Sequence, residues 1–292
     1  MESEVILYEG GSDFAEIKIE QVASGFQFTE GPLWHPGNYL LFSDTPANKI
    51  YQLFPDGSSK VFLDKSGFIG MDTSMLSDMI GSNGLALEDD NIIICQHGDH
   101  AIACLNKNME LSVLTDCYEG KPFNSPNDLI IKADESIYFS DPPYGLKDQV
   151  PDPDAFQPVA GVYRYFEGKT KRIFDELKYP NGVCFSPDEQ ILYISSNHGD
   201  EPRLYKCLLS VSGDIIEKSV LIEQNADGIA TDPEGNLFLS TNDGILIVSP
   251  KGQKLALLKL PDSPSNIAWG GHLYSELYIT ARSNIYRAKN FK

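Results

Sequence analysis

Six polar residues recur at the start of similar segments along the chain, and every one of them carries a side-chain oxygen. These anchor residues are Glu30, Asn83, Asn127, Asn181, Asp227 and Asn266. Asn and Asp are common where strands begin because they form turns, so each copy alone has an ordinary explanation. Glu30 is a poor turn former in the same position, and the set as a whole therefore indicates a shared chemical role.

Converging oxygen donors of this kind predict a bound cation. Carboxylate and amide oxygens are costly to enclose together unless a positive charge compensates them. No Cys or His stands among the anchor residues, which favours a hard ion such as Ca²⁺ or Mg²⁺ over a softer metal. We expect Ca²⁺ because its coordination shell is larger and more flexible, while Mg²⁺, Mn²⁺ or Zn²⁺ can also occupy oxygen-rich sites.

The segments that position these residues have a common pattern. Each anchor residue, usually followed by Gly, precedes two short apolar runs separated by a turn cluster such as 186–190 (SPDEQ) or 232–236 (DPEGN). Neighbouring anchors lie 39 to 54 residues apart, and further strand-like runs such as 161–168 (GVYRYFEG) follow. This period is typical of propeller blades. The sequence predicts an all-β fold, a single six-bladed β-propeller over residues 1–292 with a central metal site.

In a propeller the first strand of each blade lines the central axis, so the anchor residues are expected to share one channel. The ring is expected to close through residues 4–10 (EVILYEG), pairing as an extra strand with the last blade. Loops 66–80, 96–101 and 143–160 are expected at the channel mouth. The apolar residues of the first loop either form a lid over the channel mouth or simply pack beneath the loop. They are Phe68, Met71, Met75 and Met79.

Composition excludes several function classes. The formal net charge is −19, and no basic stripe is present to contact phosphates or anionic lipid. No apolar run approaches the roughly 20 residues of a membrane span, and the acidic N-terminus does not resemble a secretory signal. Five cysteines without a CxxC pair indicate a reduced protein. We predict a cytoplasmic protein with no nucleic-acid or membrane partner.

Several stretches resemble one family. They are EGPLW (30–34), SPNDL (125–129), DPPYG (141–145), YPNGVCFSPD (179–188), LYISS (192–196) and ADGIATDPEGNLF (226–238). Together they resemble the regucalcin, gluconolactonase and luciferin-regenerating enzyme (SMP-30-like) family, and more distantly diisopropyl fluorophosphatase and paraoxonase. The resemblance implies metal ligands at Glu30, Asn181 and Asp227, with Asn127 binding the metal or holding substrate beside it.

The resemblance also implies a metal-dependent hydrolase, with Asp227 as general base or nucleophile. A cation that polarises a lactone carbonyl beside a carboxylate that activates water is a coherent hydrolytic arrangement. The best expectation is a lactonase acting on a small, gluconolactone-like substrate. Two alternatives stay open: an esterase or phosphotriesterase using the same site, and a calcium- or ligand-binding propeller without turnover. No GxSxG, HExxH, Walker or Rossmann motif supports other chemistry.

Further residues are candidates for substrate binding. Asn83 and Asn127 belong to the anchor set, His97 lies in the expected mouth loop CQHGDH (95–100), and Tyr144 lies in DPPYG. For His97 and Tyr144, an ordinary loop or packing role is about as plausible as a contact with the lactone or ester substrate. No arginine precedes Arg164, which argues against a sugar phosphate or sugar acid as the substrate.

Overall fold

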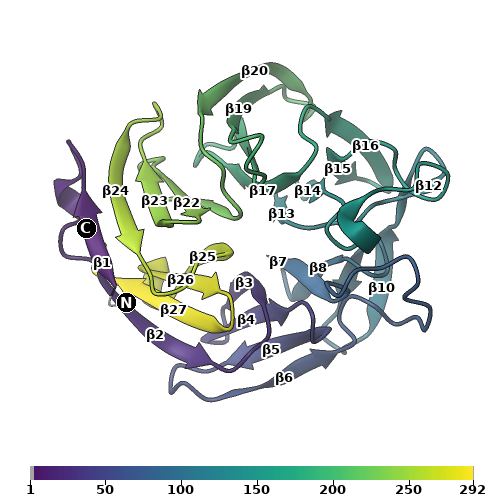
Figure 1. Cartoon of the computed structure of the whole chain (residues 1–292), viewed down its shortest axis with the longest axis horizontal. Helices are drawn as coiled ribbons and strands as arrows, with labels where there is room; N and C mark the ends of the chain where they lie inside the picture. The colour runs from purple at the N-terminus through teal and green to yellow at the C-terminus, as the bar shows by residue number, and fades with distance from the viewer. Residues whose placement is uncertain (1–2, 292) are drawn as a thin grey trace.

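A computed structural model describes residues 3–291 of the chain, and its main feature is a ring of six antiparallel sheets around a central axis (Figure 1). The chain passes round the ring in sequence order, and each predicted segment supplies the two inner strands of one sheet. The predicted all-β, six-bladed β-propeller is therefore confirmed.

Each blade is given from its innermost strand outward. Blade 1 contains β3 (Thr29–His35), β4 (Tyr39–Asp44), β5 (Lys49–Leu53) and β6 (Ser59–Asp64). Blade 2 contains β7 (Ser82–Glu88), β8 (Asn91–Gln96), β9 (Ala101–Leu105) and β10 (Leu111–Thr115). Blade 3 contains β13 (Leu129–Ile131), β14 (Ile137–Asp141), β15 (Gly161–Phe166) and β16 (Lys169–Phe174). Blade 4 contains β17 (Pro180–Phe185), β18 (Ile191–Ser196), β19 (Leu204–Leu209) and β20 (Ile215–Ile222).

The last two blades include strands from the N-terminus. Blade 5 contains β21 (Ile229–Thr231), β22 (Leu237–Thr241), β23 (Gly244–Val248), β24 (Lys254–Lys259) and β1 (Glu4–Leu7). Blade 6 contains β25 (Asn266–Gly270), β26 (Glu276–Ala281), β27 (Asn284–Lys289) and β2 (Lys18–Ser24). A separate two-stranded ribbon joins β11 (Cys117–Tyr118) to β12 (Lys121–Pro122).

The ring closes through a different segment from the one we predicted. Residues 4–10 were expected to pair with the last blade, but β1 pairs with β24 at the outer edge of blade 5. Strand β2 pairs instead with β27 and completes blade 6, so this blade is built from both ends of the chain (Figure 1). Between β1 and β2 the chain makes a short turn, in which Phe14 packs into the hydrophobic cluster between the two blades.

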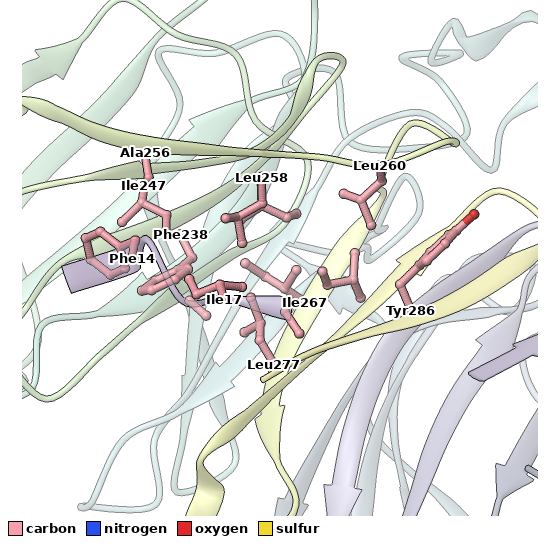
Figure 2. Close-up of a cluster of buried hydrophobic side chains, with 14 of the residues drawn as sticks. Phe14, Ile17, Phe238, Ile247, Ala256, Leu258, Leu260, Ile267, Leu277 and Tyr286 are labelled. Carbon is pink, nitrogen blue, oxygen red and sulfur yellow. The ribbon is translucent and has the colours of Figure 1, made fainter. Parts of the chain in front are cut away.

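The hydrophobic core lies between the faces of adjacent blades. Figure 2 shows the cluster at the seam between blades 5 and 6, where Phe14 packs with Phe238, Leu258 and Leu277. Burying one such side chain contributes about 1.5–3 kcal/mol. Neighbouring blades cover both faces of each blade. The sequences of its middle strands are therefore continuous apolar runs, as in the second strand of blade 2 (NIIICQ). The seams therefore hold the blades at fixed angles around the channel.

Helical structure is limited to three short 3₁₀ turns in residues 3–291: η1 (Ser12–Phe14), η2 (Lys147–Gln149) and η3 (His272–Tyr274). In that part of the chain, no helix has the length and apolar character needed to cross a bilayer. The loop at residues 65–81 is irregular and lies against the loop at residues 142–160. Lys147 N–H donates to the Met75 carbonyl at 2.9 Å, and Ser77 N–H donates to the Gly145 carbonyl at 2.9 Å.

Candidate active site

The central channel has a cavity toward each end, a polar one and one with a mostly apolar lining. We call the end at which the innermost strands begin the upper end, and the other the lower end. A cavity of about 130 Å³ at the upper end is lined by five of the six anchor residues: Glu30, Asn83, Asn127, Asn181 and Asp227. The sixth, Asn266, lines the lower cavity of about 260 Å³ instead. Five of the six anchor residues therefore converge on one cavity, as expected, and Asn266 does not line that cavity.

The glycine that follows most anchor residues has a steric reason. A β-carbon at Gly31 would lie 1.9 Å from the carbonyl oxygen of Asn83, the anchor residue of the next blade. At Gly182 the corresponding distance to the Asp227 carbonyl oxygen would be 2.4 Å. Only glycine allows this close approach of neighbouring backbones. The polar–glycine pattern in the sequence thus brings successive anchor residues together around a narrow axis.

Asn127 lies in a loop rather than in a strand. The buried carboxylate of Asp141, at the end of β14, accepts the backbone N–H groups of Asn124 at 2.9 Å and Ser125 at 2.8 Å. Asn127 N–H in turn donates to the Ser140 carbonyl at 2.9 Å. Burial raises the pKa of Asp141 to about 7, and the two N–H groups act against that rise. Asp141 therefore holds the loop that places Asn127 in the cavity.

The two carboxylates of the site lie close enough to influence each other. Burial is the main cause that raises the pKa of Glu30 well above its usual range, followed by the charges of Asp227 and Asp128. The pKa of Asp227 is also raised, first by burial and then by Asp128. Asn197 Nδ2 donates to Asp227 Oδ2 at 2.7 Å, which fixes one carboxylate oxygen. Among the described residues, no lysine or arginine lines this cavity.

The donor set fits a hard divalent cation. The side-chain oxygens of Asn83 and Asn181 are buried and accept no hydrogen bond within residues 3–291. Two neighbouring buried carboxylates and two unpartnered amide oxygens together create a demand for positive charge, which oxygen-seeking ions such as Ca²⁺ satisfy. Among the described residues, no three His, Cys, Asp or Glu side chains are arranged so that they alone could hold a metal ion. The donors are thus carboxylates supplemented by amides.

His97 lies behind Asn127. Its side chain is fully buried, and Nδ1 lies 3.0 Å from the Met79 carbonyl oxygen. Because a carbonyl can only accept, Nδ1 carries the proton, and Nε2 accepts from Asn127 Nδ2 at 3.2 Å. Burial lowers the pKa of His97 to about 4 and keeps the ring neutral. Both ring nitrogens have protein partners, so the predicted substrate contact would require one of these bonds to break.

Tyr144 forms one wall of the cavity. Its ring stacks on Tyr179 with centroids 5.7 Å apart, and Tyr179 stacks on His198 at 4.4 Å. Burial raises the pKa of the Tyr144 hydroxyl, so it stays protonated and available as a hydrogen-bond donor. The structure therefore brings Tyr144 together with the anchor residues, as the sequence interpretation expected.

Four lining residues were not predicted as site residues: Phe28, Met79, Gln149 and Asn197. Asn197 has a signal in the sequence, because it follows the second strand of its blade directly, as His97 does in blade 2. Gln149 has none, because it lies in the irregular loop at residues 142–160. Met79 lines the cavity, while Met71 on the same loop is 98% exposed, so the apolar residues of that loop do not form a continuous lid.

Comparison with known proteins gives consistent results. A family model described as the SMP-30/Gluconolactonase/LRE-like region matches residues 28–283. The chain is 34% identical to the gluconolactonase of Zymomonas mobilis over 287 residues, covering 93% of this chain and 81% of that one. It is 27% identical to human regucalcin, covering 91% of this chain and 87% of regucalcin.

Solved structures extend the comparison to three dimensions. A gluconolactonase from Xanthomonas campestris superimposes with a TM-score of 0.82 at 26% identity, covering 97% of this chain and 93% of that one. A calcium-binding regucalcin from Agrobacterium tumefaciens superimposes with a TM-score of 0.72 at 18% identity, covering 91% and 93% respectively. At that identity the second likeness supports the fold alone.

Proposed function

Because the chain belongs to the SMP-30/Gluconolactonase/LRE-like family, we propose that it is a hydrolase that opens a small lactone with the help of one divalent cation, Ca²⁺ in the first instance. The observation that carries the proposal is the group of buried oxygen donors at the upper end. Two of them, Asn83 Oδ1 and Asn181 Oδ1, accept no hydrogen bond from the described residues. A relative named gluconolactonase at 34% identity supports the substrate class.

Glu30, Asn127, Asn181 and Asp227 would hold the cation. When bound, it supplies the positive charge that polarises the lactone carbonyl and stabilises negative charge developing on its oxygen. The same charge would compensate the repulsion between Glu30 and Asp227, which otherwise raises the pKa of Glu30. Mg²⁺, Mn²⁺ and Zn²⁺ are the other ions to be tested.

Asp227 is the catalytic base in this proposal. Its Oδ2 accepts a hydrogen bond from Asn197 Nδ2 at 2.7 Å, which orients the carboxylate that would take a proton from the attacking water. The water oxygen bonds to the carbonyl carbon, the bond between that carbon and the ring oxygen breaks, and the ring oxygen receives a proton to become a hydroxyl. Water and the lactone are the only reactants, and a hydroxy acid is the product.

The remaining lining residues bind and orient the lactone. Asn83, Asn127 and the Tyr144 hydroxyl supply hydrogen bonds, while Phe28 and Met79 limit the access of bulk water. His97 acts through Asn127, because its Nε2 fixes the orientation of that amide. A cavity with two carboxylates and no lysine or arginine among the described lining residues favours a neutral lactone over an anionic substrate.

The test uses chelator-treated protein and a panel of sugar lactones, aliphatic lactones and aryl esters, with each divalent cation added back separately. We expect turnover of one lactone class that returns with the cation and is lost in Asp227→Ala. Turnover of aryl esters or phosphotriesters alone would replace the lactone with the other substrate class. Tight calcium binding without any turnover would favour a calcium-binding role, the property that the relative from Agrobacterium tumefaciens carries in its name.

A further inference from the structure

A second, larger hollow adjoins the upper cavity on the same face of the propeller. It has a volume of about 500 Å³, against about 130 Å³ for the cavity that holds the anchor residues. The loop at residues 142–160 forms one side of this hollow, and residues 175–179 form the other. We call it the side groove. It is large enough for a substituent that the upper cavity cannot hold.

The side groove and the upper cavity share a boundary. Gln149 lines both, and Tyr144 of the cavity stacks on Tyr179 of the groove with ring centroids 5.7 Å apart. Gln149 has a left-handed backbone (φ 56°), a conformation that costs a non-glycine residue about 1 kcal/mol or more. The loop holds it there, because Gln149 N–H donates to the Leu146 carbonyl at 3.0 Å. The groove is therefore the hollow next to the cavity on the Gln149 side.

The surface that the groove offers to a ligand is apolar. Val150 is 67% exposed and Val159 is 42% exposed, and both line the groove together with Pro143, Pro151 and Pro158. Exposed apolar side chains gathered in one concave site are typical of a binding surface.

The carboxylates at the groove rim already have protein partners. Asp175 pairs with Arg172 at 3.7 Å, and Glu176 pairs with Lys218 at 2.5 Å. Glu201 accepts the backbone N–H of Lys178 at 3.0 Å. These groups therefore offer little to a cationic ligand, and they disfavour an anionic one. Lys178 is the one cation among the described lining residues, and the rest of the lining suits a neutral hydrocarbon.

We propose that the side groove binds an apolar substituent of the substrate, so that lactones with an alkyl or aryl side chain are preferred over unsubstituted sugar lactones. This inference rests on the proposed lactone hydrolysis, with the lactone ring in the upper cavity and the substituent passing Gln149. The occupant is part of the substrate because the groove borders the candidate active site, with Gln149 in the lining of both.

The experiment compares lactones of one ring size whose side chain grows from none to about eight carbons. We expect kcat/KM to rise by about fourfold for each added methylene until the groove is filled, given the usual value of burying that group. The double variant Val150→Asp, Val159→Asp should remove this rise while leaving the rate with the unsubstituted lactone unchanged. Both positions are exposed, so the fold should tolerate the charges.

Val211→Asp is the matched control, because Val211 is fully exposed in the turn between β19 and β20. It should retain the dependence on chain length. A flat series in the parent protein that still hydrolyses the unsubstituted lactone would overturn the groove assignment alone. An equal rise of kcat/KM with chain length in the double variant would also overturn the groove assignment.

A binding measurement separates the groove from the chemistry. Alkyl-substituted lactams of the same ring size are not readily hydrolysed, and their dissociation constants can be measured by calorimetry with the cation-loaded protein. We expect the affinity to increase with chain length in the parent and in Val211→Asp, but not in the double variant. If no lactone is hydrolysed while this pattern is found, the proposed reaction fails and the groove assignment survives. Lactam affinities that do not change with chain length would overturn it.

Discussion

The two ends of the channel differ in how their amide oxygens are satisfied. The carboxylates accept hydrogen bonds at both ends, and at the upper end Glu30 accepts the Gly31 N–H at 3.2 Å and Asp227 accepts Asn197 Nδ2 at 2.7 Å. At the lower end, Asp128 accepts the N–H of Leu129 at 3.0 Å and that of Val183 at 3.3 Å, and Asn266 Oδ1 accepts the N–H of Ile267 at 2.8 Å. At the upper end, the corresponding oxygens of Asn83 and Asn181 accept no hydrogen bond within residues 3–291.

This difference separates structural polar groups from groups kept for a ligand. A buried oxygen that receives backbone N–H groups is satisfied by the fold itself and contributes to its stability. A buried oxygen without a donor costs free energy, and that cost is recovered when a hydrogen-bond donor or a cation binds. The backbone contacts of Asp128 and Asn266 thus belong to the fold, whereas the amide oxygens of Asn83 and Asn181 remain available to a ligand.

The largest expected effect is at the upper end. Asp227→Asn preserves the size of the side chain but removes the base, and we expect kcat/KM for the lactone to fall by about 10³-fold. The fold should persist by circular dichroism and thermal melting. The control is Glu234→Gln, the same loss of charge in the exposed turn at the lower end of blade 5, which should leave kcat/KM unchanged. An equal fall of kcat/KM in both variants would contradict the proposed difference between the two ends.

Calcium binding should stabilise the protein through the upper end only. At a free calcium concentration 100 times the dissociation constant, the free energy of unfolding should rise by about 2.7 kcal/mol. Glu30→Gln removes one of the two carboxylates and should abolish most of this gain, measured by calorimetric melting with calcium and with chelator. Asp128→Asn at the lower end should keep the gain. A loss in Asp128→Asn as well would mean that both ends hold the ion.

The lower end should matter more for stability than for binding. Asp128→Ala leaves the N–H groups of Leu129 and Val183 without an acceptor, and we expect the free energy of unfolding to fall by about 2 kcal/mol. Asn83→Ala removes an oxygen that accepts no hydrogen bond from the described chain, so its effect on the metal-free protein should be smaller. Urea unfolding in the presence of chelator measures both. The reverse order would contradict the assignment of the two ends.

The sequence predicted the repeat and the convergence at the upper end because both follow from local patterns. Asn266 occupies the same position in its segment, yet it lines the lower cavity, where its Oδ1 accepts the neighbouring Ile267 N–H. Which cavity the Asn266 side chain lines depends on the backbone geometry of its own strand. The spacing of the repeats carries no information about that geometry. The pairing of β2 rather than β1 with blade 6 joins strands from the two ends of the chain, which no local pattern specifies. Gln149 belongs to an irregular loop, where no periodicity exists to place it.

His97 gives the smallest expected effect on binding. It lies at the upper end, but both its ring nitrogens have hydrogen-bond partners within the protein, as the polar groups of the lower end do. It therefore tests the comparison of the two ends directly. His97→Leu removes the acceptor of Asn127 Nδ2 and frees that amide to turn. We expect the calcium dissociation constant to rise about tenfold, as is usual when the partner of a metal ligand is lost. His97→Gln can return an acceptor oxygen and should restore part of the affinity, measured by titration with a calcium indicator. A purely structural His97 would lower the melting temperature in both variants and leave the dissociation constant unchanged.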